Sequence, residues 1–195
     1  MFNRTIINDL KHWKEQKDRK PLMMLGARQV GKTSVLKRFG RECFEHCVYF
    51  SLDEEAGVCD IFRTTKNPTQ IIEQLSYLTD EPILPEKTLL VLDEIQDCPE
   101  AISSMKYFCE KTPEYAIACA GSLLGLAFGH EGFSFPVGKV DHINMYPVTF
   151  SEFLEQKDSG LYRYYKSIDS IEPLPQVFFD RLSQAFTAYR ISGGM

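Results

Sequence analysis

Residues 22–39 read LMMLGARQVGKTSVLKRF, and the stretch GARQVGKT at 26–33 matches the phosphate-binding pattern G-x-x-x-x-G-K-[ST] at every fixed position. The preceding run, PLMMLG, is bounded by proline and glycine and is too short for a helix, so it predicts a buried strand. A helix is expected over 32–39, with Gly40 as its C-terminal stop. A strand, a glycine-rich turn and a helix in this order predict a Walker A loop that holds phosphate groups.

Each residue type in the loop has a chemical role in this interpretation. The glycines let backbone N–H groups approach phosphate oxygens, and the helix directs the positive end of its dipole to the same place. Lys32 is expected to reach the β- and γ-phosphates, and the Thr33 hydroxyl to bind Mg²⁺. The residues expected to bind the nucleotide are Gly26, Ala27, Arg28, Gln29, Val30, Gly31, Lys32, Thr33 and Ser34.

A second stretch, LLVLDE at 89–94, supplies the carboxylates that such a loop needs. Its apolar residues predict a buried strand, and Asp93 follows at the C-terminal tip, where open α/β sheets bind ligands. Asp93 is expected to hold Mg²⁺ through water, together with Thr33. Glu94 is expected to accept a proton from the attacking water or to polarise it. The adjacent acidic pair, a Walker B pattern, favours hydrolysis over phosphoryl transfer to a small molecule.

Ser122 ends a further predicted strand, where its hydroxyl is expected to contact the γ-phosphate or to position the water. The alternative is an ordinary serine in a Gly-Ser turn. Arg28 and Lys139 are candidates for the cation that neutralises transition-state charge, and a surface role is open for each. No complete guanine-reading motif supports GTP, so the expected cofactors are ATP and Mg²⁺.

Strands and helices alternate along most of the chain. Strands are expected at 21–26, 47–53, 88–96, 115–122 and 139–148. Helices are expected at 4–17, 32–39, 67–78, 99–112 and 177–189, and also after Thr149, where Thr149 and Glu152 have the spacing of a capping box. Near-continuous apolar strands that alternate with helices predict an α/β fold, in which helices flank a parallel sheet.

Composition and charge limit the class of protein. The chain has 195 residues, 44% hydrophobic and 25% charged, which is typical of a globular protein with one sizeable domain and a small appendage. The net charge of −5 argues against a dedicated nucleic-acid module. DNA stays open as a partner because the first twenty residues are basic. No secretory or membrane-spanning segment is evident, so a cytoplasmic location is expected.

The cysteines are expected to be reduced thiols in or near the core. Cys43, His46, Cys47 and Cys59 suggest a zinc site, but their spacing matches no common ligand pattern.

Several long stretches resemble a prokaryotic family of AAA+-type ATPases with an N-terminal ATPase domain and a C-terminal domain of unknown function. The stretches are RKPLMMLGARQVGKTSVLKRFG, TLLVLDEIQDCPEAISSMKYFCE, AGSLLG and FPVGKVDHINMYPVTFSEFLE. The resemblance covers roughly residues 4–157 and, more weakly, the YRISGGM ending. It implies a P-loop NTPase fold with a five-stranded sheet in the order 5-1-4-3-2. It also implies the roles given above for the Walker residues, and Ser122 as the γ-phosphate sensor.

The domain organisation and function follow as expectations. Residues 1–158 are expected to form an AAA+-like ATP-binding domain with an N-terminal helix, and 159–195 a helical tail that begins a lid or C-terminal region. Members of the family continue past the Gly-Gly-Met segment, so their C-terminal domain is expected to be missing here. The expected function is ATP hydrolysis to ADP and phosphate, coupled to a conformational change in an attached domain, a partner domain or a homo-oligomer. The alternative is a nucleotide-dependent binding switch with little turnover, with DNA as a further partner.

Overall fold

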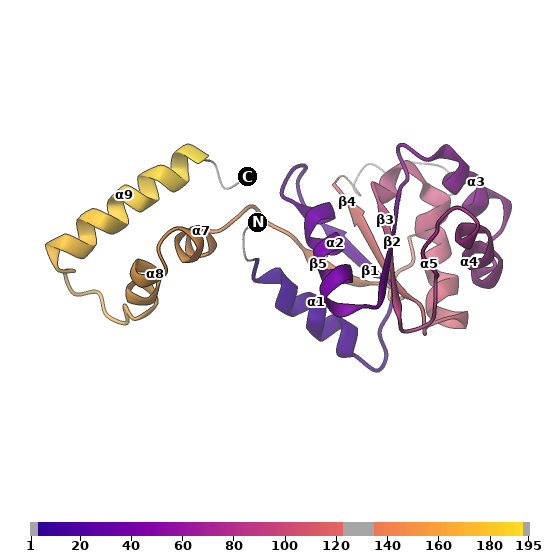
Figure 1. The fold of residues 1–195 in the computed structure, drawn as a ribbon, viewed down its shortest axis with the longest axis horizontal. Coiled ribbons are helices and arrows are strands. Elements are labelled where there is room, and N and C mark those ends of the chain that lie inside the picture. The colour runs from indigo at the N-terminus through magenta and orange to yellow at the C-terminus, as the bar shows by residue number, and fades with distance from the viewer. Residues whose placement is uncertain (1–3, 123–134, 193–195) are drawn as a thin grey trace. The chain divides into compact units, whose positions relative to one another are not determined.

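The computed structural model describes residues 4–122 and 135–192, and Figure 1 shows their ribbon. The chain divides into two compact units. One is Ile6–Met145, and the other comprises the described parts of Met1–Thr5 and Tyr146–Met195. The compact units therefore divide after Met145, whereas the expected domain boundary at 158 stays a prediction.

The larger unit alternates strands and helices. Its strands are β1 (Leu22–Leu25), β2 (His46–Ser51), β3 (Thr88–Asp93), β4 (Ala116–Gly121) and β5 (Asp141–Asn144). Its helices are α1 (Ile6–Glu15), α2 (Lys32–Cys43), α3 (Ala56–Thr64), α4 (Pro68–Ser76) and α5 (Pro99–Lys111), with a 3₁₀ turn at Ile95–Asp97. The smaller unit contains α7 (Phe150–Lys157), α8 (Ser159–Lys166) and α9 (Gln176–Ser192).

The five strands form one sheet in the order β2-β3-β4-β1-β5, and every neighbouring pair is parallel. This confirms the expected α/β fold and the order 5-1-4-3-2, read from the opposite edge. Leu25 lies beside Gly121, and Ser51 lies beside Asp93. These strands therefore all end on the same side of the sheet, its carboxyl end, and the phosphate loop begins there.

Helices cover both faces of the sheet (Figure 1). Helices α3, α4 and α5 bury Phe62, Ile71 and Phe108 against one face, and helices α1 and α2 bury Trp13 and Phe39 against the other. Every residue of β3 and β4 is buried. Burial on both faces explains why these two strands are almost continuously apolar in sequence.

The end of α2 differs from the expectation. The helix continues to Cys43, and Gly40 lies inside it instead of at its stop. A Cβ atom at Gly40 would lie 2.2 Å from the Cys47 Sγ on β2. The missing side chain therefore lets α2 pack closely on the edge strand, which is a different reason for a glycine than helix termination.

Other boundaries also differ from the sequence-based expectation. Strand β3 ends at Asp93 and not at 96, because Glu94 has a left-handed backbone with φ 48° that interrupts the extended chain. Helix α3 was not expected, and it begins without a side-chain cap. Helix α8 was also not expected; the Asp158 side chain caps it by accepting the Leu161 N–H.

The smaller unit confirms the expected capping box. The Thr149 hydroxyl accepts the Glu152 N–H, and the Glu152 carboxylate accepts the Thr149 N–H at 2.9 Å. The same carboxylate accepts the N–H and hydroxyl of Thr5 and pairs with Arg4 at 3.3 Å. Burial disfavours the charged carboxylate, but these partners outweigh it and lower the Glu152 pKa. Glu152 therefore joins the start of α7 to the segment before α1.

We expect Gly40→Ala to destabilise the larger unit by about 1–3 kcal/mol, because the new methyl group overlaps Cys47. Helix propensity alone would favour alanine by up to about 1 kcal/mol. The measurement is the free energy of unfolding from a urea titration. Gly57→Ala on α3 is the matched control, because a Cβ there meets no atom within 4 Å. Equal stability changes in the two variants would contradict the packing explanation.

Candidate functional site

The phosphate loop lies between β1 and α2 at the carboxyl end of the sheet. Gly31 has φ 94° and Gln29 has φ 64°, so two loop residues adopt the left-handed region. Such turns direct successive N–H groups into an anion-binding hollow, and α2 begins directly after it at Lys32. A Cβ atom at Gly26 would lie 2.2 Å from the carbonyl oxygen of Met145. Glycine is therefore required for backbone conformation at 31 and for close approach at 26.

Lys32 folds over the loop. Its Nζ donates hydrogen bonds to the carbonyl oxygens of Gly26 at 2.9 Å and Ala27 at 2.7 Å. Burial lowers the pKa of the ammonium group below its ordinary value, although the carboxylates of Glu94 and Asp93 act in the opposite direction. A buried cation with two carbonyl partners is positioned to exchange them for phosphate oxygens.

Asp93 connects three elements. Its Oδ2 accepts hydrogen bonds from the Thr33 hydroxyl at 2.5 Å and the Tyr49 hydroxyl at 3.2 Å, while its Oδ1 accepts the Glu94 N–H at 3.0 Å. The carboxylate is almost fully buried, with 3% of the residue exposed. Thr33 and Asp93 thus bring two hard oxygen ligands together, and such ligands suit Mg²⁺. The donor set fits the expected metal.

Glu94 follows Asp93 in a left-handed conformation, with φ 48° and ψ 45°. This conformation is uncommon for a residue other than glycine and is found frequently at functional sites. The Glu94 carboxylate accepts a hydrogen bond from the Gln96 side-chain amide at 2.6 Å, and that amide also donates to Asp97 at 3.0 Å. Gln96 therefore holds the side chain expected to act as the base.

Ser122 directly follows β4, and its neighbour Gly121 pairs in register with Leu25, the residue before the phosphate loop. Within the described residues, the buried Ser122 Oγ has no hydrogen-bond partner. A buried hydroxyl without a partner is uncommon in folded proteins and is consistent with a ligand contact at this position.

The remaining loop residues and candidate cations lie nearer the surface. Ala27, Arg28, Gln29 and Ser34 are exposed, whereas Val30 is buried. Lys139 pairs with Glu110 at 3.0 Å, and this partner raises the pKa of its ammonium group. Lys139 is therefore engaged in a surface ion pair with α5, and Arg28 is the candidate cation that belongs to the loop itself.

Two residues of this site were not identified from the sequence. Tyr49 is one of them, and its signal is its place in β2: it lies two residues before Ser51, which pairs in register with Asp93. A hydroxyl on the apolar face of a strand needs a polar partner, but the sequence does not show which one. Gln96 is the other: the sequence predicts a strand that ends at 96, whereas a 3₁₀ turn directs the Gln96 amide to Glu94.

Two other expectations concern absences. No cluster of three or more potential metal-binding side chains occurs in residues 4–122 and 135–192, so zinc finds no support there. No helix in the described part of the chain is long and apolar enough to cross a membrane.

A family model described as an AAA domain matches residues 18–154, and no curated protein matches the sequence. Among solved structures, C. elegans PCH-2 has 11% identity and a TM-score of 0.48, and the match covers 88% of this chain and 50% of that one. Replication initiator DnaA bound to AMPPCP and single-stranded DNA has 16% identity and a TM-score of 0.48, with 97% and 60% covered. AMPPCP-bound DnaA from Aquifex aeolicus has 13% identity and a TM-score of 0.44, with 96% and 60% covered.

This chain thus spans between half and three-fifths of the length of those three structures. The family match covers more than half of this chain and includes the phosphate loop, the Asp93–Glu94 pair and Ser122. With the five-stranded parallel sheet and the loop geometry, it leads to one conclusion. The chain belongs to the AAA domain family of P-loop ATPases.

Proposed function

We propose that the chain binds ATP with Mg²⁺ and hydrolyses it to ADP and phosphate, and that the change of nucleotide state drives a conformational change in an attached or partner domain. The observation that carries the proposal is the hydrogen bond between Thr33 and Asp93 at 2.5 Å, directly beside the Lys32 loop. It brings a phosphate-binding loop and a metal-binding carboxylate to one point. DNA and homo-oligomer partners stay predictions.

The residues divide the chemistry among themselves. Backbone N–H groups of the loop and the Lys32 ammonium hold the phosphates, and the Ser122 hydroxyl contacts the γ-phosphate. Bound Mg²⁺ would be held by Thr33 and Asp93 and would neutralise phosphate charge. Glu94 accepts a proton from the attacking water, whose oxygen forms the new bond to phosphorus as the bond to ADP breaks. Phosphate and ADP are the products, and the proton leaves Glu94 for solvent.

We expect Glu94→Gln to reduce the ATP hydrolysis rate by about a hundredfold or more, because the amide cannot accept the proton from water. Binding of a fluorescent ATP analogue should be retained, since Glu94 does not hold the phosphates. The measurement is steady-state phosphate release with Mg²⁺ present. Undiminished turnover in the variant would contradict the assigned base. Failure of the parent chain to bind nucleotide would contradict the whole proposal.

We expect Tyr49→Phe to raise the Mg²⁺ concentration needed for ATP binding by about fivefold, because one hydrogen bond that orients Asp93 is worth about 1 kcal/mol. Binding in the absence of Mg²⁺ should not change. The measurement is a Mg²⁺ titration at fixed nucleotide concentration. Tyr77→Phe is the control, because Tyr77 is 77% exposed. An identical Mg²⁺ dependence in both variants would exclude a role for Tyr49.

A binding switch with little turnover is the second candidate, and the Gln96 contact favours it. The amide occupies one oxygen of Glu94 at 2.6 Å and so competes with water for the base. If this contact restrains hydrolysis, Gln96→Ala should raise the turnover number several-fold with little change in nucleotide affinity. A lower turnover number in Gln96→Ala would instead make Gln96 a residue that positions Glu94 for hydrolysis.

A further inference from the structure

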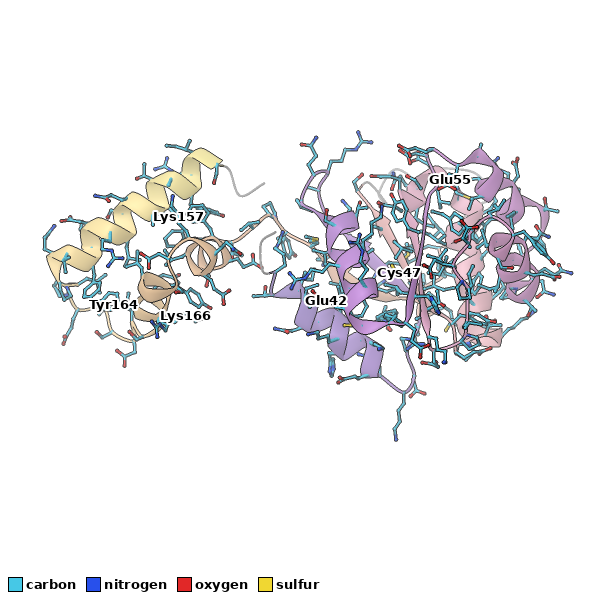
Figure 2. The ribbon with its side chains drawn as sticks, in the orientation of Figure 1. Glu42, Cys47, Glu55, Lys157, Tyr164 and Lys166 are labelled. Atoms are coloured by element: carbon cyan, nitrogen blue, oxygen red, sulfur yellow. The ribbon has the colours of Figure 1, made fainter. Side chains whose placement is uncertain are left out.

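Strand β2 is at the edge of the sheet, and it pairs only with β3 among the described residues. Peptide groups alternate in direction along such a strand. The His46 N–H donates to the Lys87 carbonyl at 3.1 Å, and the Leu52 N–H donates to the Asp93 carbonyl at 3.1 Å. The backbone N–H and carbonyl groups of the even-numbered residues of β2 therefore face β3. The peptide groups of Cys47 and Tyr49 consequently face the open edge. Figure 2 labels Cys47, which lies in β2.

One end of this edge is closed within the chain. The Ser51 N–H, which also points outward, donates to the Glu55 carboxylate at 3.0 Å, and the Ser51 carbonyl accepts the Glu55 N–H at 2.9 Å. Cys47 and Tyr49 are therefore the two positions at which a further strand can bond to β2. An exposed edge of this kind is a template for strand addition.

A groove of about 470 Å³ runs beside the open edge, between β2 and helix α2. Lys37, Gly40 and Arg41 of α2 form one wall, and Cys47 and Tyr49 of β2 form the other. Gly40 contributes no side chain, so the wall is low where the helix passes the strand. A segment added to β2 would place every second side chain in this groove, because side chains alternate between the two faces of a strand.

The helix wall of the groove is cationic. The Lys37 Nζ lies 3.3 Å from the centroid of the Tyr49 ring, and Arg41 lies one helical turn further along the same side of α2. The acidic Glu42 beside them is paired with Arg38 at 2.7 Å.

The acidic residues at the end of the groove contact basic groups of their own, and the contact of Glu81 is an ion pair when His46 is protonated. Glu45 contacts Lys87 at 3.1 Å, and Glu81 contacts His46 at 2.7 Å. Lys37 and Arg41 are thus the cations of the groove that form no ion pair with a carboxylate of the described residues.

We propose that this groove binds an extended acidic segment of a partner protein, which adds to β2 as a further strand. Its main chain bonds to the outward peptide groups of Cys47 and Tyr49, and its acidic side chains lie beside Lys37 and Arg41. Main-chain bonds supply affinity in this mode of recognition, and the side-chain groove supplies specificity. A second copy of the chain fits less well, because antiparallel pairing of two β2 edges brings the Lys37 and Arg41 cations of both copies together.

The test uses the full 195-residue chain and two fluorescein-labelled, acetylated heptapeptides. In one, glutamate alternates with valine, and in the other, lysine replaces each glutamate. Fluorescence anisotropy should give at least about tenfold tighter binding of the glutamate peptide, since a difference of about 1.4 kcal/mol corresponds to tenfold. High salt should narrow that difference by screening the charges.

Two substitutions separate the charge from the main-chain contacts. Arg41→Glu should weaken binding of the glutamate peptide by about tenfold and improve binding of the lysine peptide. Cys47→Pro removes an outward N–H that β3 does not use, and should weaken both peptides. Lys66→Glu, an equal charge change at an exposed position between α3 and α4, is the control and should alter neither affinity. Circular dichroism and thermal unfolding verify that each variant is folded.

Three outcomes would overturn the proposal. The first is equal affinity for the two peptides in the parent chain, or no measurable binding of either. The second is unchanged binding by folded Cys47→Pro. The third is a dimer in sedimentation experiments that Cys47→Pro abolishes and the glutamate peptide does not compete with, which would assign the edge to a second copy of the chain. None of these results bears on ATP hydrolysis, so the proposed function is tested independently.

Discussion

The hydrogen bond from the Thr33 hydroxyl to Asp93 is the contact on which the candidate site depends. It joins residues 60 positions apart in sequence at a distance of 2.5 Å. The parallel sheet makes this possible, because β1 and β3 both end at the same edge with β4 between them. Without that topology the loop at 26–33 would not lie beside the Asp93 carboxylate. The order of the strands therefore determines which side chains meet in the candidate site.

Much of the fold was predictable because two patterns are strong. The loop at 26–33 fixes a strand before it and a helix after it, and LLVLDE fixes a second buried strand with carboxylates at its tip. The sheet order came from the resemblance to a family, since local periodicity does not say which strands are neighbours. Helix α3 was missed because it begins with Ala56 and Gly57, without a capping side chain.

The structure brings the predicted loop and acidic pair together, and their chemical roles stay predictions; the sequence does not indicate the contacts that support them. Tyr49 reaches Asp93 only because β2 and β3 pair in one particular register. Gln96 reaches Glu94 only because the chain turns after Asp93 into the left-handed region. Both contacts depend on tertiary geometry, which a single sequence does not contain. Gly40 shows the same limit. Its position in the sequence suggests a helix stop, whereas a glycine is needed there because the neighbouring strand leaves no room for a side chain.

The contacts of Lys32 have a further consequence, which concerns the rate and heat of ligand binding. Its ammonium group is already bonded to the Gly26 and Ala27 carbonyls, so on the proposed function a phosphate group replaces these bonds and does not fill free hydrogen-bond positions. The net enthalpy is then the difference between the ammonium bonds to charged phosphate oxygens and the two ammonium bonds to neutral carbonyl oxygens. The side chain must also leave the loop before it can bind the phosphate. On the proposed function, association at this site therefore includes a rearrangement of the Lys32 side chain in addition to diffusional encounter.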